Sequence, residues 1–172
     1  MGNIMLPPIN FKNWIEDNRH LLKPPVGNKV VYENTELIIM IVGGPNARKD
    51  YHIDEGEEFF YQLEGNMLLR IMENSKPKDI SINEGEIFLL PPKIPHSPQR
   101  FENTVGLVVE RKRHSGELDG FQWYCDECYT LLYEKYISLT DIVTQLPPLF
   151  ETFWENKDAR KCQACHAYLE KP

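Results

Sequence analysis

The sequence lacks the marks of a membrane or exported protein. No apolar run approaches the roughly 20 residues that a membrane-spanning helix needs. The stretch from Met1 to Pro8 has neither the basic start nor the long apolar core of a secretory signal. We therefore expect a cytoplasmic protein with no membrane partner.

Basic residues are too few for a nucleic-acid-binding protein. The 19 Lys and Arg residues are outnumbered by 26 Asp and Glu residues, which gives a formal charge of −7. This balance argues against nucleic acid or an anionic membrane surface as the main partner. With 172 residues, of which 41% are hydrophobic, the chain can form one domain with a real core, alone or with a small appendage.

Cysteine is also scarce, and its placement is informative. All four cysteines fall in two Cys-x-x-Cys pairs separated by 33 residues, namely Cys125, Cys128, Cys162 and Cys165. In a chain without an export signal, this arrangement favours a metal site, and two disulfides are the alternative. Four thiolates suit tetrahedral zinc or a single rubredoxin-like iron, and the spacing does not decide between the two metals.

Hydrophobic periodicity indicates a mainly β fold. Residues 10–22 read as an amphipathic helix that Asn10 caps, that Pro24-Pro25 ends and that covers part of a sheet. Strands are predicted at 29–33, 36–42, 57–63, 66–73, 78–82, 86–90 and 104–112. Many short strands with regular breaks predict a sandwich or barrel.

The pattern changes after residue 113. Residues 116–120 read as a connector that leads towards the first cysteine pair, and 129–137 as one more strand. A short helix with proline in its first turn is expected after Pro147-Pro148. We predict a barrel over residues 1–120 and a small metal-stapled extension over 121–172, which is too short to have much core of its own.

Two motifs in the strand-rich part supply metal ligands. The first is His-x-Asp-x3-Glu-x6-Gly from His52 through Glu58 to Gly65, and the second is Gly-x5-Pro-x4-His ending at His96. Each residue alone has a simpler interpretation: His96 could be a structural residue, and Glu58 could form a solvent-exposed pair of acids with Glu57. Together, two imidazoles and one carboxylate with positions left open are typical of non-heme Fe(II) oxygenases.

These motifs resemble those of the cupin superfamily, which implies a double-stranded β-helix, or jelly-roll barrel. Asp54 stands where the usual first motif has a second histidine, so we expect three protein ligands unless Asp54 substitutes. Two arginines flank the motifs, since Arg48 lies four residues before His52 and Arg100 four after His96. Their planar guanidinium groups match a carboxylate, so we predict an anionic organic substrate.

Glu110 belongs to the same set. Strand alternation places Glu110 on the face opposite to that of its apolar neighbours. If that face lines the barrel, Glu110 is a buried acid and needs a hydrogen-bonding or charged partner. Periodicity alone leaves open that Arg48, Arg100 and Glu110 are all surface charges.

The resemblance becomes specific when longer segments are considered. Segments similar to the 3-hydroxyanthranilate 3,4-dioxygenase family are Leu22–Asn28, Val42–Asn46, Glu57–Leu63, Phe88–Pro92, His96–Arg100, Leu118–Cys125 and Leu146–Phe150. The similarity implies an Fe(II) enzyme that opens the ring of a small aromatic acid with O2, and a homodimer. The expected product is 2-amino-3-carboxymuconate semialdehyde, the precursor of quinolinate.

The same resemblance assigns roles residue by residue. It implies catalytic iron ligands at His52, Glu58 and His96, substrate contacts at Glu58, Arg100 and Glu110, and an oxygen-site arginine at Arg48, with Arg48 and Glu110 as catalytic residues. It also implies iron, remote from catalysis, at the four cysteines. Two alternatives stay open: a non-catalytic metal-binding cupin that acts as a sensor or store, and a cupin dioxygenase for another small carboxylic acid.

Overall fold

The chain folds into two antiparallel sheets. The computed structural model describes residues 5, 7–24 and 27–172, without the side chains of 142 and 143. Pro25 and most of the N-terminal stretch considered for a leader lie outside the described residues. Within them, one sheet has the order β1 (Asn28–Val30), β2 (Leu37–Gly43), β9 (Val105–Arg111), β4 (Glu58–Glu64) and β7 (Ile87–Leu90). The other has the order β11 (Leu131–Ile137), β10 (Asp119–Tyr124), β3 (Asp50–Ile53), β8 (His96–Arg100), β5 (Met67–Glu73) and β6 (Lys76–Ile82).

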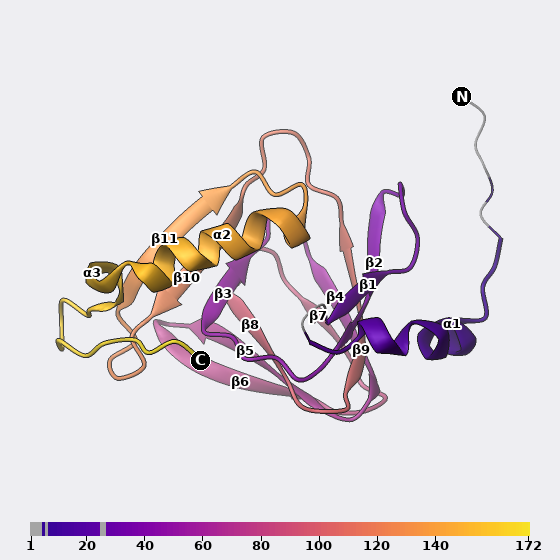
Figure 1. Ribbon diagram of the computed structural model, residues 1–172, viewed down its shortest axis with the longest axis horizontal. Coiled ribbons are helices and arrows are strands. Elements are labelled where there is room, and N and C mark those ends of the chain that lie inside the picture. Colours follow the sequence, from indigo (N-terminus) through magenta and orange to yellow (C-terminus); the bar gives the residue numbers. More distant parts are fainter. Residues whose placement is uncertain (1–4, 6, 25–26) are drawn as a thin grey trace.

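The strand order is that of a jelly roll. Strands β2 to β9 alternate between two four-stranded halves, β2-β9-β4-β7 and β3-β8-β5-β6, as in a double Greek key. Figure 1 shows the two halves enclosing a common interior. The predicted fold class, a mainly β cupin barrel with a few helices and a C-terminal extension, is confirmed.

Three strands were missed by the sequence pattern. Residues 119–124 form β10, although the sequence indicated a connector that ran on towards the cysteines, and β3 and β8 are too short to show clear alternation. Proline in β8 at position 98 further weakens the strand pattern there.

Side-chain alternation fills the interior with apolar residues. Met67, Leu69 and Ile71 point inward from β5 and pack against Phe60 of β4 and Val108 of β9. Because successive side chains of a strand point to opposite faces, residues two positions away on β4 and β9 also point inward. Glu58 and Glu110 are therefore interior residues.

The N-terminal helix covers one outer face. Helix α1 (Phe11–Asn18) begins at Asn10, whose side chain accepts a hydrogen bond from the Asn13 N–H, and a 3-10 turn (Arg19–Leu21) follows it. Ile15 packs with Ile41 and Val105 on the outer side of β2 and β9. The predicted helix, its cap and its covering role are confirmed.

The C-terminal segment extends the six-stranded sheet. β10 pairs with β3 and β11 with β10, so the predicted boundary at 120/121 falls within β10. Helix α2 (Ile142–Glu155) lies over these strands on the opposite side of the barrel from α1 (Figure 1) and stacks Phe153 on Trp123. A short helix, α3 (Lys157–Arg160), follows.

Helix α2 differs from its prediction at its start. Pro147 and Pro148 lie inside the helix rather than in its first turn, because the helix begins at residue 142. Gln145 stabilises this early start by accepting hydrogen bonds from the Thr140 and Asp141 N–H groups. Among the described residues, no helix is long and apolar enough to cross a bilayer.

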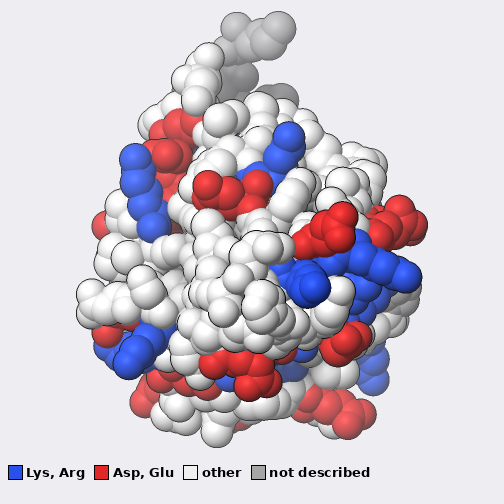
Figure 2. All heavy atoms as spheres, turned by 90° about the vertical axis from the view of Figure 1, so that its left-hand side faces the viewer, with Lys and Arg blue, Asp and Glu red and all other residues white. Residues whose placement is uncertain are grey.

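Charge is mixed on the face that carries the C-terminal segment. Figure 2 shows Lys and Arg side chains interspersed with Asp and Glu side chains over this face. Nearby opposite charges form pairs, such as Lys49 with Asp126 at 2.7 Å.

Candidate metal centre and active site

The three predicted metal ligands converge in the barrel interior. His52 of β3 and His96 of β8 are directly paired across the sheet, and Glu58 opens β4 in the facing sheet. Glu58 Oε1 lies 3.4 Å from His52 Nδ1 and 3.0 Å from His96 Nε2. One donor atom from each residue lies within 4.8 Å of the others. This arrangement suits one metal ion with two imidazoles and a carboxylate.

Hydrogen bonds fix both imidazole rings. His96 Nδ1 lies 2.9 Å from the Ile94 carbonyl oxygen, so its Nε2 is the nitrogen that faces Glu58. His52 Nε2 lies 2.7 Å from Asp119 Oδ1, and the ring stacks on Phe121 with centroids 5.1 Å apart. A carbonyl or carboxylate behind the ring is the usual support of a metal-binding histidine. Asp119 was not identified from the sequence, because it stood in the expected connector.

The interior holds more negative than positive side-chain charge. Three arginine side chains face five buried carboxylates, and the residues are Arg48, Arg100 and Arg113 against Asp50, Asp54, Glu58, Glu110 and Asp119. With all groups ionised and both histidines neutral, two negative charges remain. A divalent cation between His52, Glu58 and His96 would balance them, so the residues present fit such an ion.

Electrostatic effects on the ligands agree with a cation site. Burial lowers the pKa of His52, but hydrogen bonds to Asp119 and Glu58 outweigh it and raise that pKa to about 9. Burial raises the pKa of Glu58, but His96 and His52 hold it well below its usual value. The pocket therefore attracts positive charge, which a metal supplies in place of protons.

Arg100 is a buried cation without an anion of its own. Its side chain lies in the interior against Gly106 of β9, and its Nη1 has no hydrogen-bond partner among the described residues. Burial and the nearby Arg48 lower the pKa of Arg100 to about 10, against the attraction of Glu58. A buried, unsatisfied guanidinium favours a carboxylate ligand.

Arg48 precedes β3 and lines two cavities. One of about 550 Å³ is also lined by Val42 and Asn46, and the other is a groove of about 570 Å³ on the outer face of the six-stranded sheet. Its guanidinium is paired with Asp50 at 2.5 Å. Burial lowers the pKa of Arg48, but Asp50 and Glu58 more than restore it. Asn46 ties this segment to Arg100, because its side chain accepts a hydrogen bond from the Arg100 N–H.

Glu110 faces the interior, as strand alternation predicted. Burial and the neighbouring Glu58 raise the pKa of Glu110 to about 7, against the opposing effect of Arg113. Its carboxylate accepts a hydrogen bond of 2.9 Å from Arg113, which is the partner that a buried acid needs. Arg113 itself was not identified from the sequence, where it is the third of three consecutive basic residues.

Asp54 does not take the place of the missing histidine. Its Oδ2 lies 3.0 Å from Arg113 Nη2, and its Oδ1 accepts a hydrogen bond from the Gly56 N–H. One of its oxygens also lies within 4.8 Å of oxygens of Glu58 and Glu110, which completes a buried acidic group.

The four cysteines form a second cluster, remote in sequence from the first. Cys125 Sγ lies 3.5 Å from Cys165 Sγ, and Cys128 Sγ lies 3.4 Å from Cys162 Sγ. All four are free, so the disulfide alternative does not hold. Thiolates at about 2.3 Å around a tetrahedral metal stand about 3.8 Å apart, which is close to these distances.

The two cysteine turns have the same backbone. Tyr129 and His166, each one residue after a pair, have left-handed φ angles of 60° and 65°. Their N–H groups donate to the carbonyl oxygens of Cys125 and Cys162, both at 3.0 Å. The cluster is thus built from two matching halves.

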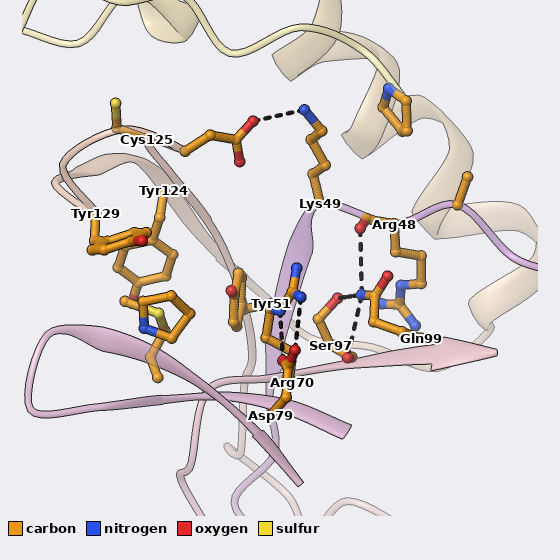
Figure 3. Close-up of a pocket in the computed structure, with 15 residues that line it drawn as sticks. Arg48, Lys49, Tyr51, Arg70, Asp79, Ser97, Gln99, Tyr124, Cys125 and Tyr129 are labelled. Atoms are coloured by element: carbon orange, nitrogen blue, oxygen red, sulfur yellow. Dashed lines mark hydrogen bonds and ion pairs between the residues drawn. The ribbon is translucent and has the colours of Figure 1, made fainter. Parts of the chain in front are cut away.

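A larger groove lies on the outer face of the six-stranded sheet. This groove of about 570 Å³ is lined by Tyr51, Ser97 and Gln99 (Figure 3), whose sequence neighbours His52, His96 and Arg100 point to the other face of the sheet. Arg70 and Asp79, which form an ion pair between the adjacent strands β5 and β6, also line it. The groove is therefore separated from the metal ligands by the sheet itself.

Comparison with known sequences identifies close relatives. A model of the 3-hydroxyanthranilic acid dioxygenase family matches residues 4–154. Proteins named 3-hydroxyanthranilate 3,4-dioxygenase from Xanthomonas euvesicatoria pv. vesicatoria and Xanthomonas campestris pv. campestris are 53% and 54% identical. Each match covers 94% of this chain and 92% of the relative. A protein of the same name from a Jannaschia species is 53% identical over 93% of this chain and 89% of its own.

Likeness to solved structures is weaker. A Neisseria meningitidis protein has a TM-score of 0.48 at 18% identity, with 62% of this chain and 100% of that chain covered. A cupin-2 domain containing protein from Shewanella frigidimarina has a TM-score of 0.47 at 18% identity, with 61% and 94% covered. The fold is assigned from the strand order.

Proposed function

The chain belongs to the 3-hydroxyanthranilic acid dioxygenase family, and we propose that it uses O2 to open the aromatic ring of 3-hydroxyanthranilate. The expected product is 2-amino-3-carboxymuconate semialdehyde. The observation that carries the proposal is the pairing of a two-histidine, one-glutamate cluster with the buried, unpartnered Arg100. The identity of more than half over nearly the whole chain supports it.

We propose Fe(II) as the metal that His52, Glu58 and His96 would hold. Two imidazoles and one carboxylate are the ligand set of non-heme Fe(II) oxygenases. When bound, ferrous iron supplies open coordination positions and the electron that activates dioxygen. Everything else in the reaction depends on how the protein binds and orients the substrate.

The two ends of β8 carry the groups that would hold the substrate. Along β8 the inward side chains run from His96 through Pro98 to Arg100, and along β4 from Glu58 to Phe60. This arrangement suits an aromatic acid whose hydroxyl, amino and carboxylate groups lie on adjacent ring carbons, because the first two could bind the metal while the carboxylate meets Arg100. Arg100 would bind the carboxylate through two parallel hydrogen bonds.

Two further residues have proposed roles in the chemistry. Arg48 would stabilise negative charge that develops on oxygen, since its guanidinium is paired with Asp50 and feels the charge of the metal ligand Glu58. Glu110 would accept the proton of the substrate hydroxyl, because its pKa of about 7 suits a group that exchanges protons near neutrality. Glu58 would also contact the substrate.

One experiment separates this function from its alternatives. The apoprotein is loaded with Fe(II) without oxygen, then given 3-hydroxyanthranilate and air, and the absorbance of the semialdehyde is followed. A non-catalytic sensor would bind the acid without consuming O2. A dioxygenase for another small acid would consume O2 only with that acid, so a silent trace with 3-hydroxyanthranilate would contradict the proposal.

The cysteine cluster is proposed to hold a second iron or a zinc ion. The ion would fasten together the two cysteine turns of the extension over residues 121–172. Contrary to the expectation from its length, this extension has an aromatic core of its own around Trp123 and Phe153. In this reading the barrel over residues 1–120 carries the chemistry. Metal analysis of the purified protein, with and without Cys162→Ser, would test the assignment.

A homodimer is proposed from an exposed apolar strip. Ile87 and Leu89 of β7 are 65% and 53% exposed, and they pair with Tyr61 and Phe59 of β4 on the same outer face. A second copy of this chain would cover the strip with an identical strip of its own. Ile87→Asp with Leu89→Asp should yield a monomer by light scattering, while a monomeric wild type would contradict the assignment.

A further inference from the structure

Arg113 enters the active site from the loop between β9 and β10. Its side chain is only 12% exposed and contacts carboxylates from three separate segments. Its Nη1 donates to Glu110 at 2.9 Å, and its Nη2 donates to Asp119 at 2.6 Å. Nη2 also lies 3.0 Å from Asp54.

Through these contacts Arg113 links a residue that supports a metal ligand to a residue proposed to contact the substrate. Asp119, held by Arg113, is the carboxylate behind the His52 ring at 2.7 Å. Glu110, held by the same guanidinium, is the acid proposed to receive the substrate proton. The guanidinium holds the two carboxylates with separate nitrogens, Nη1 for Glu110 and Nη2 for Asp119, whereas a lysine ammonium offers a single nitrogen.

The loop that carries Arg113 is itself clamped. Glu117 accepts hydrogen bonds from Arg111 at 2.6 and 2.7 Å and from the His114 N–H at 2.7 Å. Arg113 lies between these two residues, so its backbone is fixed on both sides. The guanidinium therefore holds a set position over the acidic group.

We propose that Arg113 is a positioning residue that couples the metal centre to the substrate-binding acid. It holds Asp119, and through it His52, in the orientation that binds metal, and it holds Glu110 in the orientation that meets the substrate. The part of the proposal that concerns Asp119 and metal binding rests on the geometry alone. The part that concerns Glu110 and the substrate rests on the proposed function.

The test compares the variant Arg113→Lys with variants of the two carboxylates that Arg113 holds, Asp119 and Glu110. Fe(II) affinity of the apoprotein is measured anaerobically by competition with a chelator, and KM and kcat are measured with 3-hydroxyanthranilate. Because changes behind a metal ligand typically cost about 10- to 100-fold in metal affinity, Arg113→Lys should weaken Fe(II) binding by that factor and also raise KM. Asp119→Asn should act mainly on Fe(II) affinity, and Glu110→Gln should act mainly on the substrate, with a raised KM and a lowered kcat.

A matched control is available on the outer face of the sheet. Arg70 forms a two-bond pair with Asp79, 2.7 and 2.9 Å long, away from the metal ligands. Arg70→Lys should leave both Fe(II) affinity and KM unchanged. A folded Arg113→Lys protein that behaves like this control would overturn the proposal.

A second measurement covers a failure of Arg113→Lys to fold. If Arg113 couples Glu110 to Asp119, the double variant Glu110→Gln/Asp119→Asn should depart from the product of the single effects on Fe(II) affinity by about threefold or more. Independent effects would overturn the proposal. A wild-type protein that binds Fe(II) but does not convert 3-hydroxyanthranilate would refute the proposed function and leave intact the part of the test that concerns Asp119 and metal binding.

Discussion

Gly106 provides a sharp test of the position of Arg100. A Cβ atom at this site would lie 2.6 Å from Arg100 Nη1 and 2.8 Å from Gln62 Oε1. Since ordinary contact begins at 3.4 Å, Gly106→Ala should push the guanidinium away by about 0.8 Å. The backbone of Gly106 is ordinary extended strand, so alanine adds no backbone strain, and any cost to the fold comes from the contacts with the buried Gln62 and Arg100.

The expected loss follows from the proposed substrate contact. A shift of this size should remove one of two charge-assisted hydrogen bonds to the carboxylate, worth about 1.5–3 kcal/mol. At 1.4 kcal/mol per factor of ten, kcat/KM should fall about 10- to 100-fold. The loss should fall mainly on KM, because Arg100 binds the substrate away from the reacting bond.

The assay is steady-state turnover of 3-hydroxyanthranilate by fully iron-loaded protein, with thermal unfolding as the check on folding. Arg100→Ala provides the matched background, since Gly106→Ala should have no further effect once the guanidinium is gone. An unchanged KM in folded Gly106→Ala, or an equal loss in both backgrounds, would refute the reasoning.

Three other predictions test separate parts of the molecule. Arg100→Ala should mainly raise KM, and Arg48→Ala should mainly lower kcat. If steady-state kinetics show both variants unchanged, neither arginine takes part in substrate binding or catalysis. Cys162→Ser should lower the melting temperature by roughly 5 °C or more but hardly alter kcat, and lost turnover in a folded, iron-loaded variant would contradict a structural role. Hydrogen bonds from Arg111 lower the pKa of Glu117 to about 2 from its usual 4.5, so this carboxylate stabilises the fold above pH 4.5 and ceases to do so as pH falls towards 2. Urea unfolding at several acidic pH values should show a shallower loss for Glu117→Gln than for the wild type, and identical profiles would refute the effect.

The sequence predicted those site residues whose positions depend on local spacing. His52 and Glu58 lie in one short motif, and His96 follows a proline turn at a set distance, so strand and turn geometry places all three inward. The cysteine pairs are equally local. Each of these groups was found because its residues are close together in the chain or repeat a known spacing.

The sequence could not show contacts that depend on the register between strands. Asp54, Glu110 and Asp119 come from β3, β9 and β10 or the segments beside them, and only the folded sheets bring them to one guanidinium. Arg113 follows two basic residues, and nothing in the local sequence distinguishes it from them. The loop between β9 and β10 directs the Arg113 side chain back into the barrel, and only this brings it into contact with the three carboxylates.

The two matching cysteine turns have a consequence for the ion between them. Four sulfur donors within 4.8 Å of one another suit zinc and iron alike, so the identity of the ion proposed there would depend on which metal is abundant when the chain folds. Protein made in zinc-rich medium would then carry zinc beside the extension and still need iron in the barrel. Total metal content is therefore a poor guide to the fraction of active enzyme, and each ion has to be counted separately.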